Sequence, residues 1–213
     1  MELLSADSKS IKRAVEVLRQ GGVIAHPADT CFGLATDFTN PDAVKKIQAM
    51  KGRDGLKPMS IMLPAAFKDQ LEGYAKLNAF TREICDKLLP GPITIVLPKG
   101  PKIPKWYFPK TKFIGIRIPY APFTQDLLNA FKGALVTTSA NASGRPICHT
   151  HKEVLEFLKK SKIKLDVLVQ GTLPKDSLAS TVIWPEKNQV RIVRKGPLTA
   201  SQLTTLLGIP VVE

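Results

Sequence analysis

The segment Ala134–Pro146 reads ALVTTSANASGRP, and it joins an apolar run to a cluster of small polar residues. The run Leu135–Thr138 has the length and composition of a buried strand. The residues from Ser139 to Gly144 then offer hydroxyl and amide groups that both donate and accept hydrogen bonds. Such a segment is either a turn at the end of a strand or one wall of a site for a polar or anionic ligand.

Strands and helices alternate on both sides of this segment. Apolar residues recur at helical spacing or form the short runs typical of buried strands. The alternation predicts one α/β domain over residues 1–213, with a mixed parallel and antiparallel sheet flanked by helices. The short strands of the last third indicate that part of the sheet is antiparallel. The predicted helices are 8–20, 40–50, 81–89, 122–131, the run after 151, and 201–207, and the predicted strands are 23–25, 59–63, 92–97, 113–118, 135–138, 165–169, 180–184 and 190–193.

The charge of the chain is strongly positive. Thirty-one Lys and Arg against 18 Asp and Glu give a net charge of +13, with a pI near 9.8. This excess favours nucleic acid, nucleotides or an anionic membrane as partners, although a basic surface without a specific partner explains it equally well. No apolar stretch is long enough to predict a membrane span. The three cysteines match neither a disulfide framework nor a zinc pattern, which predicts reduced thiols in a cytoplasm.

Two basic residues follow the end of a predicted helix, and a third lies inside a predicted buried strand. Lys51 and Arg53 follow the helix that opens at Asn40-Pro41, and they supply a point charge and a planar fork for phosphate oxygens. The alternative is a solvated helix C-terminus that complements the helix dipole. Arg117 lies inside the apolar run IGIRIP and is costly to bury without an anion, unless it faces solvent.

Several common catalytic signatures are missing. The chain contains no G-x-x-x-x-G-K-[ST] and no G-x-G-x-x-G, so a P-loop or Rossmann nucleotide site is not expected. The segment Cys148-His149-Thr150-His151 is interpreted as a polar loop before a helix, because His26 is the only other histidine and no metal site is predicted. These residues alone predict a basic cleft for a small anion or a nucleic acid.

The segment Lys99–Lys112, KGPKIPKWYFPKTK, carries five lysines and no acid around a Trp-Tyr-Phe sequence. Lysines interleaved with aromatic residues are typical of surfaces that bind single-stranded nucleic acid. In the alternative interpretation, which we favour, the segment is a basic loop whose aromatic residues pack back onto the core.

The order of these segments resembles the YrdC domain family of threonylcarbamoyl-AMP synthases. The matching stretches are GGVIAHPADTCFGLATD, KGRDGLKPMSIML, GPITIVLP, IGIRIP, TTSANASGRP, ASTVIW and VRIVRKGPLT, which run from about Gly21 to Thr199. The family combines K-x-R with S-x-N, and both halves are present here. The resemblance implies a twisted, mixed parallel and antiparallel YrdC/RibB-like α/β sheet with flanking helices and a basic concave cleft.

The resemblance also implies a reaction. L-threonine, bicarbonate or CO2, and ATP with Mg²⁺ would form threonylcarbamoyl-AMP and pyrophosphate, and partner enzymes would move the product onto adenosine 37 of tRNA. The implied catalytic residues are Lys51 and Arg53. The implied ATP-binding residues are Lys51, Arg53, Ser139, Asn141 and Arg194, and the implied threonine-binding residues are Thr30, Arg117, Thr138 and Ser180.

Three positions depart from the family pattern. Ala28 replaces a hydroxyl residue, Phe32 stands where tyrosine is common, and Met62 stands where longer relatives have histidine. The end of the chain at Glu213 fits the short, stand-alone bacterial type. Two other hypotheses remain: a non-catalytic protein that binds tRNA or double-stranded RNA, and a paralogue that uses a different acyl substrate.

Overall fold

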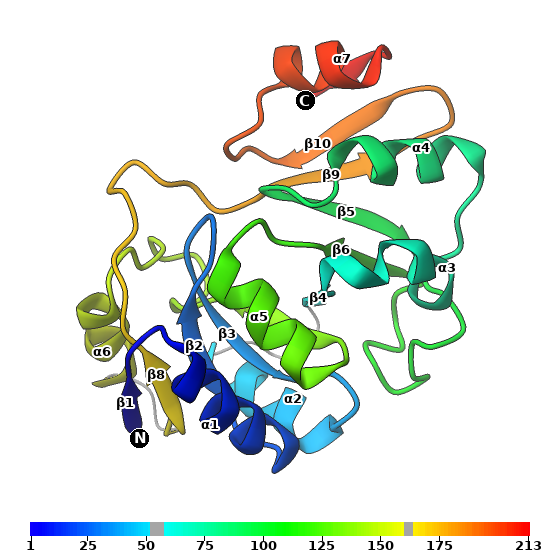
Figure 1. Cartoon of the computed structure of the whole chain (residues 1–213). Helices are drawn as coiled ribbons and strands as arrows, with labels where there is room; N and C mark the ends of the chain where they lie inside the picture. The colour runs from blue at the N-terminus through cyan, green and yellow to red at the C-terminus, as the bar shows by residue number, and fades with distance from the viewer. Residues whose placement is uncertain (52–57, 160–163) are drawn as a thin grey trace.

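One sheet of eleven strands runs through the described part of the chain, residues 1–51, 58–159 and 164–213, in this computed structural model (Figure 1). The strands are β1 (Glu2–Leu4), β2 (Ile24–Pro27), β3 (Phe32–Asp37), β4 (Ser60–Met62), β5 (Ile93–Pro98), β6 (Phe113–Arg117), β7 (Leu135–Ser139), β8 (Val167–Val169), β9 (Thr181–Pro185), β10 (Val190–Arg194) and β11 (Val211–Val212). Their order across the sheet is β1-β8-β2-β3-β7-β4-β6-β5-β9-β10-β11. Neighbouring strands are parallel in some pairs and antiparallel in others, so the predicted mixed α/β sheet is confirmed.

The helices cover the two faces of the sheet unequally. Helices α1 (Ser8–Arg19) and α5 (Pro122–Phe131) contact each other and share a hydrophobic cluster with β2, β3 and β8, and Figure 1 shows them side by side in front of β2 and β3. A second cluster takes in the helices α2 (Pro41–Met50), α3 (Leu71–Tyr74), α4 (Ala79–Leu88), α6 (His151–Lys159) and α7 (Ala200–Leu207). A 3₁₀ helix, η1, spans Ala65–Gln70. None of the helices in the described residues is long and apolar enough to cross a bilayer.

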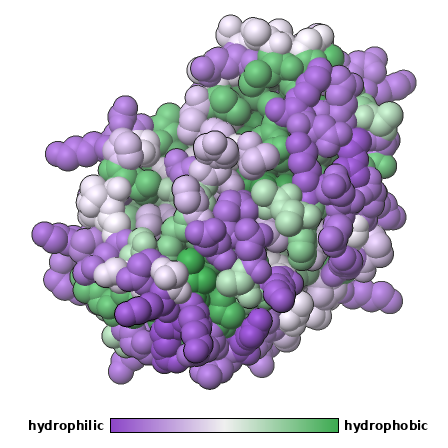
Figure 2. Space-filling model, in the orientation of Figure 1, coloured by the Kyte–Doolittle hydropathy of each residue, from purple (hydrophilic) through white to green (hydrophobic). Residues whose placement is uncertain are grey.

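Among the described residues, α1 and α5 pack on β2, β3 and β8, so the neighbouring part of this sheet face, toward β5 and β6, has no covering helix. In β4, β5 and β6 every second residue, such as Ile61, Ile95 and Ile116, belongs to the larger cluster. Because side chains alternate between faces, Ser60, Thr94 and their neighbours in these strands point the other way. Figure 2 shows that hydrophilic residues cover much of the face that carries α1 and α5. The uncovered part of the sheet is where a ligand can reach the strands.

Helix α2 begins and ends where its sequence predicts. The Asn40 side chain accepts hydrogen bonds from the backbone N–H groups of Asp42 and Ala43, both at 3.1 Å, and Pro41 occupies the first turn. The apolar residues of the helix face the core, and the helix ends at Met50. This end fixes the position of Lys51 beside the sheet.

The N-terminal part of the sheet differs from the prediction. Strand β2 continues through His26 to Pro27, and the chain returns as the antiparallel strand β3, which was not predicted. Every residue of β3 except Asp37 is buried, so the strand lacks the alternation that marks a half-exposed strand. Antiparallel pairs also join β3 to β7, β4 to β7 and β5 to β6, so they are not limited to the last third.

The lysine-rich loop packs its aromatic residues inward. Tyr107 and Phe108 are buried, and the Tyr107 hydroxyl donates to the Met59 carbonyl at 2.8 Å. The Lys99 ammonium donates to the carbonyls of Tyr107 and Phe108 at 2.5 and 2.9 Å. Only Trp106 of the three aromatic residues is exposed. The favoured interpretation of this loop is therefore confirmed for Tyr107 and Phe108.

The buried His26 predicts how stability depends on pH. Its Nδ1 lies 3.3 Å from the Thr124 hydroxyl and 3.2 Å from the Pro27 carbonyl, and burial lowers its pKa from 6.5 to about 4. Between these values the unfolded chain binds a proton that the folded chain does not, so stability falls as the pH falls. We expect the free energy of unfolding, measured with urea, to fall by about 2–3 kcal/mol from pH 7 to pH 4.5 because of His26. The variant His26→Phe should lack this contribution. The same pH dependence in both proteins would contradict this assignment.

Candidate functional site

A cavity of about 130 Å³ lies on the uncovered part of the sheet. It is lined mainly by groups that form hydrogen bonds, with Arg117 and Arg194 among its walls. The strands β4, β5, β6 and β7 position most of these side chains on one face. The hydroxyl residues that line the cavity are Ser60, Thr94, Thr137, Thr138, Ser139 and Ser180.

Arg117 is buried and faces this cavity. It lies beside Met62 in the register of β4 and β6, and 5% of its surface is exposed. Its Nη2 donates to the Thr30 hydroxyl at 2.8 Å and forms an ion pair with Asp29. The other Asp29 oxygen accepts the Tyr120 backbone N–H at 3.2 Å. The anion that the sequence required for a buried arginine is thus Asp29, and the solvent-facing alternative is wrong.

Lys51 joins the end of α2 to the end of β7. Its ammonium donates to the Ser139 carbonyl at 2.6 Å and to Asn141 Oδ1 at 2.7 Å. The Ser139 hydroxyl also donates to Asn141 Oδ1, at 2.6 Å. With 2% of its surface exposed, Lys51 is not the solvated helix end that the alternative required. The segment after β7 is therefore more than a turn, because it surrounds a buried ammonium.

Arg194 reaches the cavity from β10. Its Nε and Nη2 donate to the Ser180 carbonyl at 3.1 and 2.8 Å, and Nη2 also donates to the Ser180 hydroxyl at 2.9 Å. That hydroxyl lies 2.9 Å from the Thr94 hydroxyl. One wall of the cavity is therefore a hydrogen-bonded chain of Arg194, Ser180 and Thr94. These residues lie at the end of β10, just before β9 and within β5.

The predicted site residues meet around this cavity, within the part of the chain that the structure describes. Arg117, Thr138, Ser139, Ser180 and Arg194 line it. Three further predicted residues lie next to them: Thr30 is hydrogen-bonded to Arg117, and Lys51 and Asn141 are hydrogen-bonded to Ser139. The ninth predicted residue, Arg53, lies outside the described residues.

Sequence reasoning missed other residues around the cavity. Ser60 and Thr94 are single hydroxyl residues within apolar strands, which carry no local signal of a site. Thr137 was included in the quoted segment but was assigned no role. Asp29 falls within the quoted stretch GGVIAHPADTCFGLATD but was assigned no role, because its partner Arg117 is 88 positions away in the chain.

Positively charged groups from three distant parts of the sequence lie near the thiol of Cys31, which lines the cavity. Burial raises the pKa of this cavity-lining thiol, so it stays protonated at neutral pH. The nearby charges of Arg117, Arg194 and Lys51 act in the opposite direction and favour the thiolate. Three cations from distant parts of the sequence therefore act on one small volume, which suits an anionic ligand.

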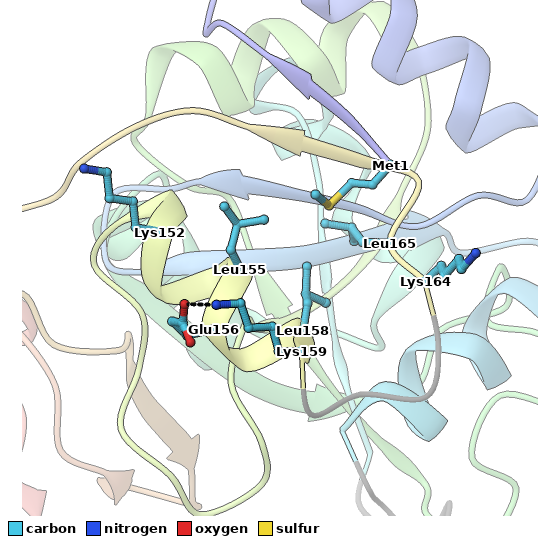
Figure 3. Close-up of a pocket in the computed structure, with 8 residues that line it drawn as sticks. All are labelled: Met1, Lys152, Leu155, Glu156, Leu158, Lys159, Lys164 and Leu165. Atoms are coloured by element: carbon cyan, nitrogen blue, oxygen red, sulfur yellow. Dashed lines mark hydrogen bonds and ion pairs between the residues drawn. The ribbon is translucent and has the colours of Figure 1, made fainter.

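A second cavity, of about 520 Å³, lies beside α6 (Figure 3). Leu155, Leu158, Leu165 and Met1 line it with apolar atoms, and lysines and Glu156 surround them. The Glu156 carboxylate and the Lys159 ammonium are paired at 2.5 Å. None of the predicted site residues that the structure describes lines this cavity, so its chemistry differs from that of the first.

The sequence of the chain matches the model of a known protein family. The model of the Sua5/YciO/YrdC family, described as "Telomere recombination", matches residues 16–196 of the chain. The matched range contains the whole set of predicted site residues.

Individual relatives agree with this match. A threonylcarbamoyl-AMP synthase of Halorhodospira halophila is 37% identical over 164 residues, which cover 76% of this chain and 83% of that protein. The crystal structure of P. abyssi Sua5 complexed with L-threonine has a TM-score of 0.89 and 24% identity, and the match covers all of this chain and 63% of that longer chain. The structure of E. coli YciO has a TM-score of 0.80 and 24% identity, with 95% and 98% covered. This chain belongs to the Sua5/YciO/YrdC family.

Proposed function

We propose that the chain is a threonylcarbamoyl-AMP synthase, which converts L-threonine, bicarbonate or CO2, and ATP into threonylcarbamoyl-AMP and pyrophosphate. The observation that carries this proposal is the hydroxyl-lined cavity with Arg117 and Arg194 in its walls and the Lys51 ammonium hydrogen-bonded to Ser139 at its edge. The name of the Halorhodospira relative supports the same activity. The proposal assigns nucleotidyl transfer to the site, because AMP is moved from ATP to an oxygen of the threonine carbamate.

The cavity is suited to threonine rather than to a whole nucleotide. Pockets that enclose a drug-sized molecule measure about 300–1,000 Å³, and this one measures about 130 Å³. In the proposal Arg117 pairs with the threonine carboxylate, and Asp29 and Thr30 hold the guanidinium in position. Thr138 and Ser180 would complete the threonine site from the neighbouring walls.

ATP would lie across the wall built by Lys51, Ser139 and Asn141, with Arg194 on the other side of the cavity and Arg53 as a further ligand. The threonine amine first joins inorganic carbon to give a carbamate, whose oxygen attacks the α-phosphate while pyrophosphate leaves. Both reactants are anions, so cations and positioning lower the barrier more than a general base does. We therefore assign the catalytic roles to Lys51 and Arg53.

Mg²⁺ would enter this site with the triphosphate. The described residues of the cavity wall supply hydroxyls and cations, and the nearby carboxylate of Asp29 is paired with Arg117. Phosphate oxygens and water would therefore provide the ligands that Mg²⁺ prefers. We further propose that the product passes to tRNA-modification enzymes in the cytoplasm that act on adenosine 37.

Pyrophosphate release tests the proposed function directly. We expect purified protein to release pyrophosphate only when L-threonine, bicarbonate, ATP and Mg²⁺ are all present, and to stop when any one is omitted. No release with the full mixture would overturn the proposal. Tight, strongly salt-dependent binding of tRNA by such an inactive protein would support the non-catalytic alternative.

A further inference from the structure

The cavity beside α6 combines an apolar floor with a positively charged rim (Figure 3). We call this cavity the α6 groove. The side chains of Lys152 and Lys164 extend from opposite ends of the floor. Neither lysine has an ion-pair partner among the described residues, whereas Lys159 is paired with Glu156. The floor consists of four apolar side chains that lie together, those of Met1, Leu155, Leu158 and Leu165.

The apolar surface continues from the α6 groove onto β1. Met1 lines the groove, and Leu3 stands two positions further along, which is the spacing that places side chains on one face of a strand. Leu3 is paired with Leu168 of β8, which belongs to the hydrophobic cluster that takes in α6. Leu3 therefore lies on the same sheet face as α6. Met1 and Leu3 are 59% and 48% exposed, and exposed apolar residues that adjoin a groove indicate an interaction site.

Strand β1 also offers main-chain groups at an open edge. It is the first strand in the order across the sheet, so within the described part of the chain it has a neighbouring strand, β8, on one side only (Figure 1). The N–H of Glu2 donates to the Asp166 carbonyl at 2.8 Å, and the Leu4 carbonyl accepts the N–H of Gln170 at 2.7 Å. Because alternate residues of a parallel strand bond to the same neighbour, the N–H and carbonyl of Leu3 face the open edge. An extended segment of another chain can pair with such an edge.

The charge and the shape of this surface favour one class of partner. A second copy of the chain would bring the same net charge of +13 and would be repelled. Single-stranded nucleic acid binds by stacking its bases on aromatic side chains, and none of the described residues that line the groove is aromatic. A flat lipid surface does not fill a concave one. An acidic protein segment with apolar side chains complements both the floor and the rim.

We infer that the α6 groove and the open edge of β1 bind an extended segment of a partner protein, with an apolar centre and carboxylates on both sides. The main chain of this segment pairs with Leu3, and its apolar side chains enter the groove. Its carboxylates lie near Lys152 and Lys164, at the two ends of the floor. This inference goes beyond the proposed function and does not depend on it, because none of these three residues lines the hydroxyl-lined cavity.

A synthetic peptide tests the inference. The probe has a leucine-valine-leucine centre, glutamates on both sides and a fluorescent label, and its binding is measured by fluorescence anisotropy. We expect a Kd below about 1 mM that rises with added salt. A peptide with lysines in place of the glutamates, and one with serines in place of the apolar centre, should bind at least about 10-fold more weakly. If the acidic apolar peptide does not bind, the inference is wrong.

Substitutions in the protein show where the peptide binds. Leu3→Asp places a carboxylate on the exposed apolar surface and should weaken binding by about 10-fold or more. Its matched control is Leu206→Asp on α7, because Leu206 is 50% exposed. Lys152→Glu should weaken binding by about 3- to 10-fold, whereas Lys12→Glu on the exposed side of α1 changes the net charge equally and should have little effect.

The same four variants separate this surface from the proposed active site. Circular dichroism should show the native fold in each, because all four substitutions are at exposed positions. Pyrophosphate release should also be unchanged in each. Equal weakening of peptide binding by a variant and its control would overturn the inference, whatever the activity of the protein.

Methylated peptides test the pairing with β1. Main-chain N–H groups point to alternate sides of an extended segment, so two versions of the peptide, N-methylated at alternate positions, block opposite edges. We expect one version to bind about 5- to 10-fold more weakly than the unmethylated peptide and the other to bind as well as it does. Equal affinities of the two versions would overturn the pairing with Leu3.

The other classes of partner are tested with the same variants. Oligouridine, vesicles of phosphatidylglycerol and self-association in sedimentation equilibrium are each measured for the wild type, Leu3→Asp and Lys152→Glu. Substitutions that weaken one of these interactions but leave peptide binding unchanged would overturn the inference and assign the surface to that partner. Selective weakening of peptide binding would support it.

Discussion

Arg117→Leu raises the concentration of L-threonine needed for half-maximal pyrophosphate release by on the order of 10²-fold, while the requirement for ATP stays nearly constant. The reason is that Arg117 is the buried cation that faces the cavity and is held there by Asp29 and Thr30. Leucine retains most of the aliphatic volume but offers no donor to the threonine carboxylate. Initial rates measured against each substrate in turn, together with calorimetric titration of threonine, give the result.

The control for this variant concerns Asp29. Its side chain is 12% exposed and loses its counter-charge when Arg117 is replaced, so the single variant is also expected to be less stable. The double variant Asp29→Asn/Arg117→Leu removes both charges and should recover stability but not threonine binding. Equal effects of Arg117→Leu on threonine and ATP would show that Arg117 is a structural ion-pair partner and not a threonine ligand.

Lys51→Met lowers the maximal rate of pyrophosphate release by about 10²–10³-fold, as for a missing donor to a developing negative charge. Its ammonium holds the Ser139 carbonyl and Asn141 Oδ1, and it belongs to the group of cations that act on the cavity. Methionine fills similar space without the charge. The loss of both the cation and the anchor for Asn141 should therefore affect the chemical step and the nucleotide site together.

The same helix supplies the matched control for Lys51. Lys45→Met removes an exposed lysine that pairs with Asp42 at 3.0 Å, and it should leave the rate unchanged. Lys51→Met should also reduce stability by about 1–3 kcal/mol, because it removes the hydrogen bonds from a buried ammonium to the Ser139 carbonyl and Asn141 Oδ1. Reduced stability with an unchanged rate would show that Lys51 anchors the segment after β7 without a part in the reaction.

Most of the helices and strands could be predicted, because the residues that indicate them lie within each element or next to it. Helix α2 has its cap at Asn40 and its proline at the first turn, and α5 begins at Pro122 as the sequence indicates. Strand β3 escaped prediction because both of its faces are buried and Gly33 interrupts its apolar run. The edge strands β1 and β11 are too short to produce a periodic pattern.

The sequence predicts a site residue when that residue type is unusual in its own segment. Arg117 stands out as the one charge in an apolar strand, and the S-x-N segment stands out by its density of polar groups. Ser60 and Thr94 do not, because a single hydroxyl in a strand is common and becomes informative only when neighbouring strands place others beside it. The ion pair of Arg117 with Asp29 depends on long-range packing, which no local pattern encodes.

The cavity is built on adjacent strands of one continuous hydrogen-bonded sheet. Folding itself therefore assembles the arginines and hydroxyls, and the entropic cost of bringing them together is met before any reactant arrives. We therefore expect activity to be lost at the temperature at which the sheet unfolds, and not at a lower temperature through separation of the cavity walls.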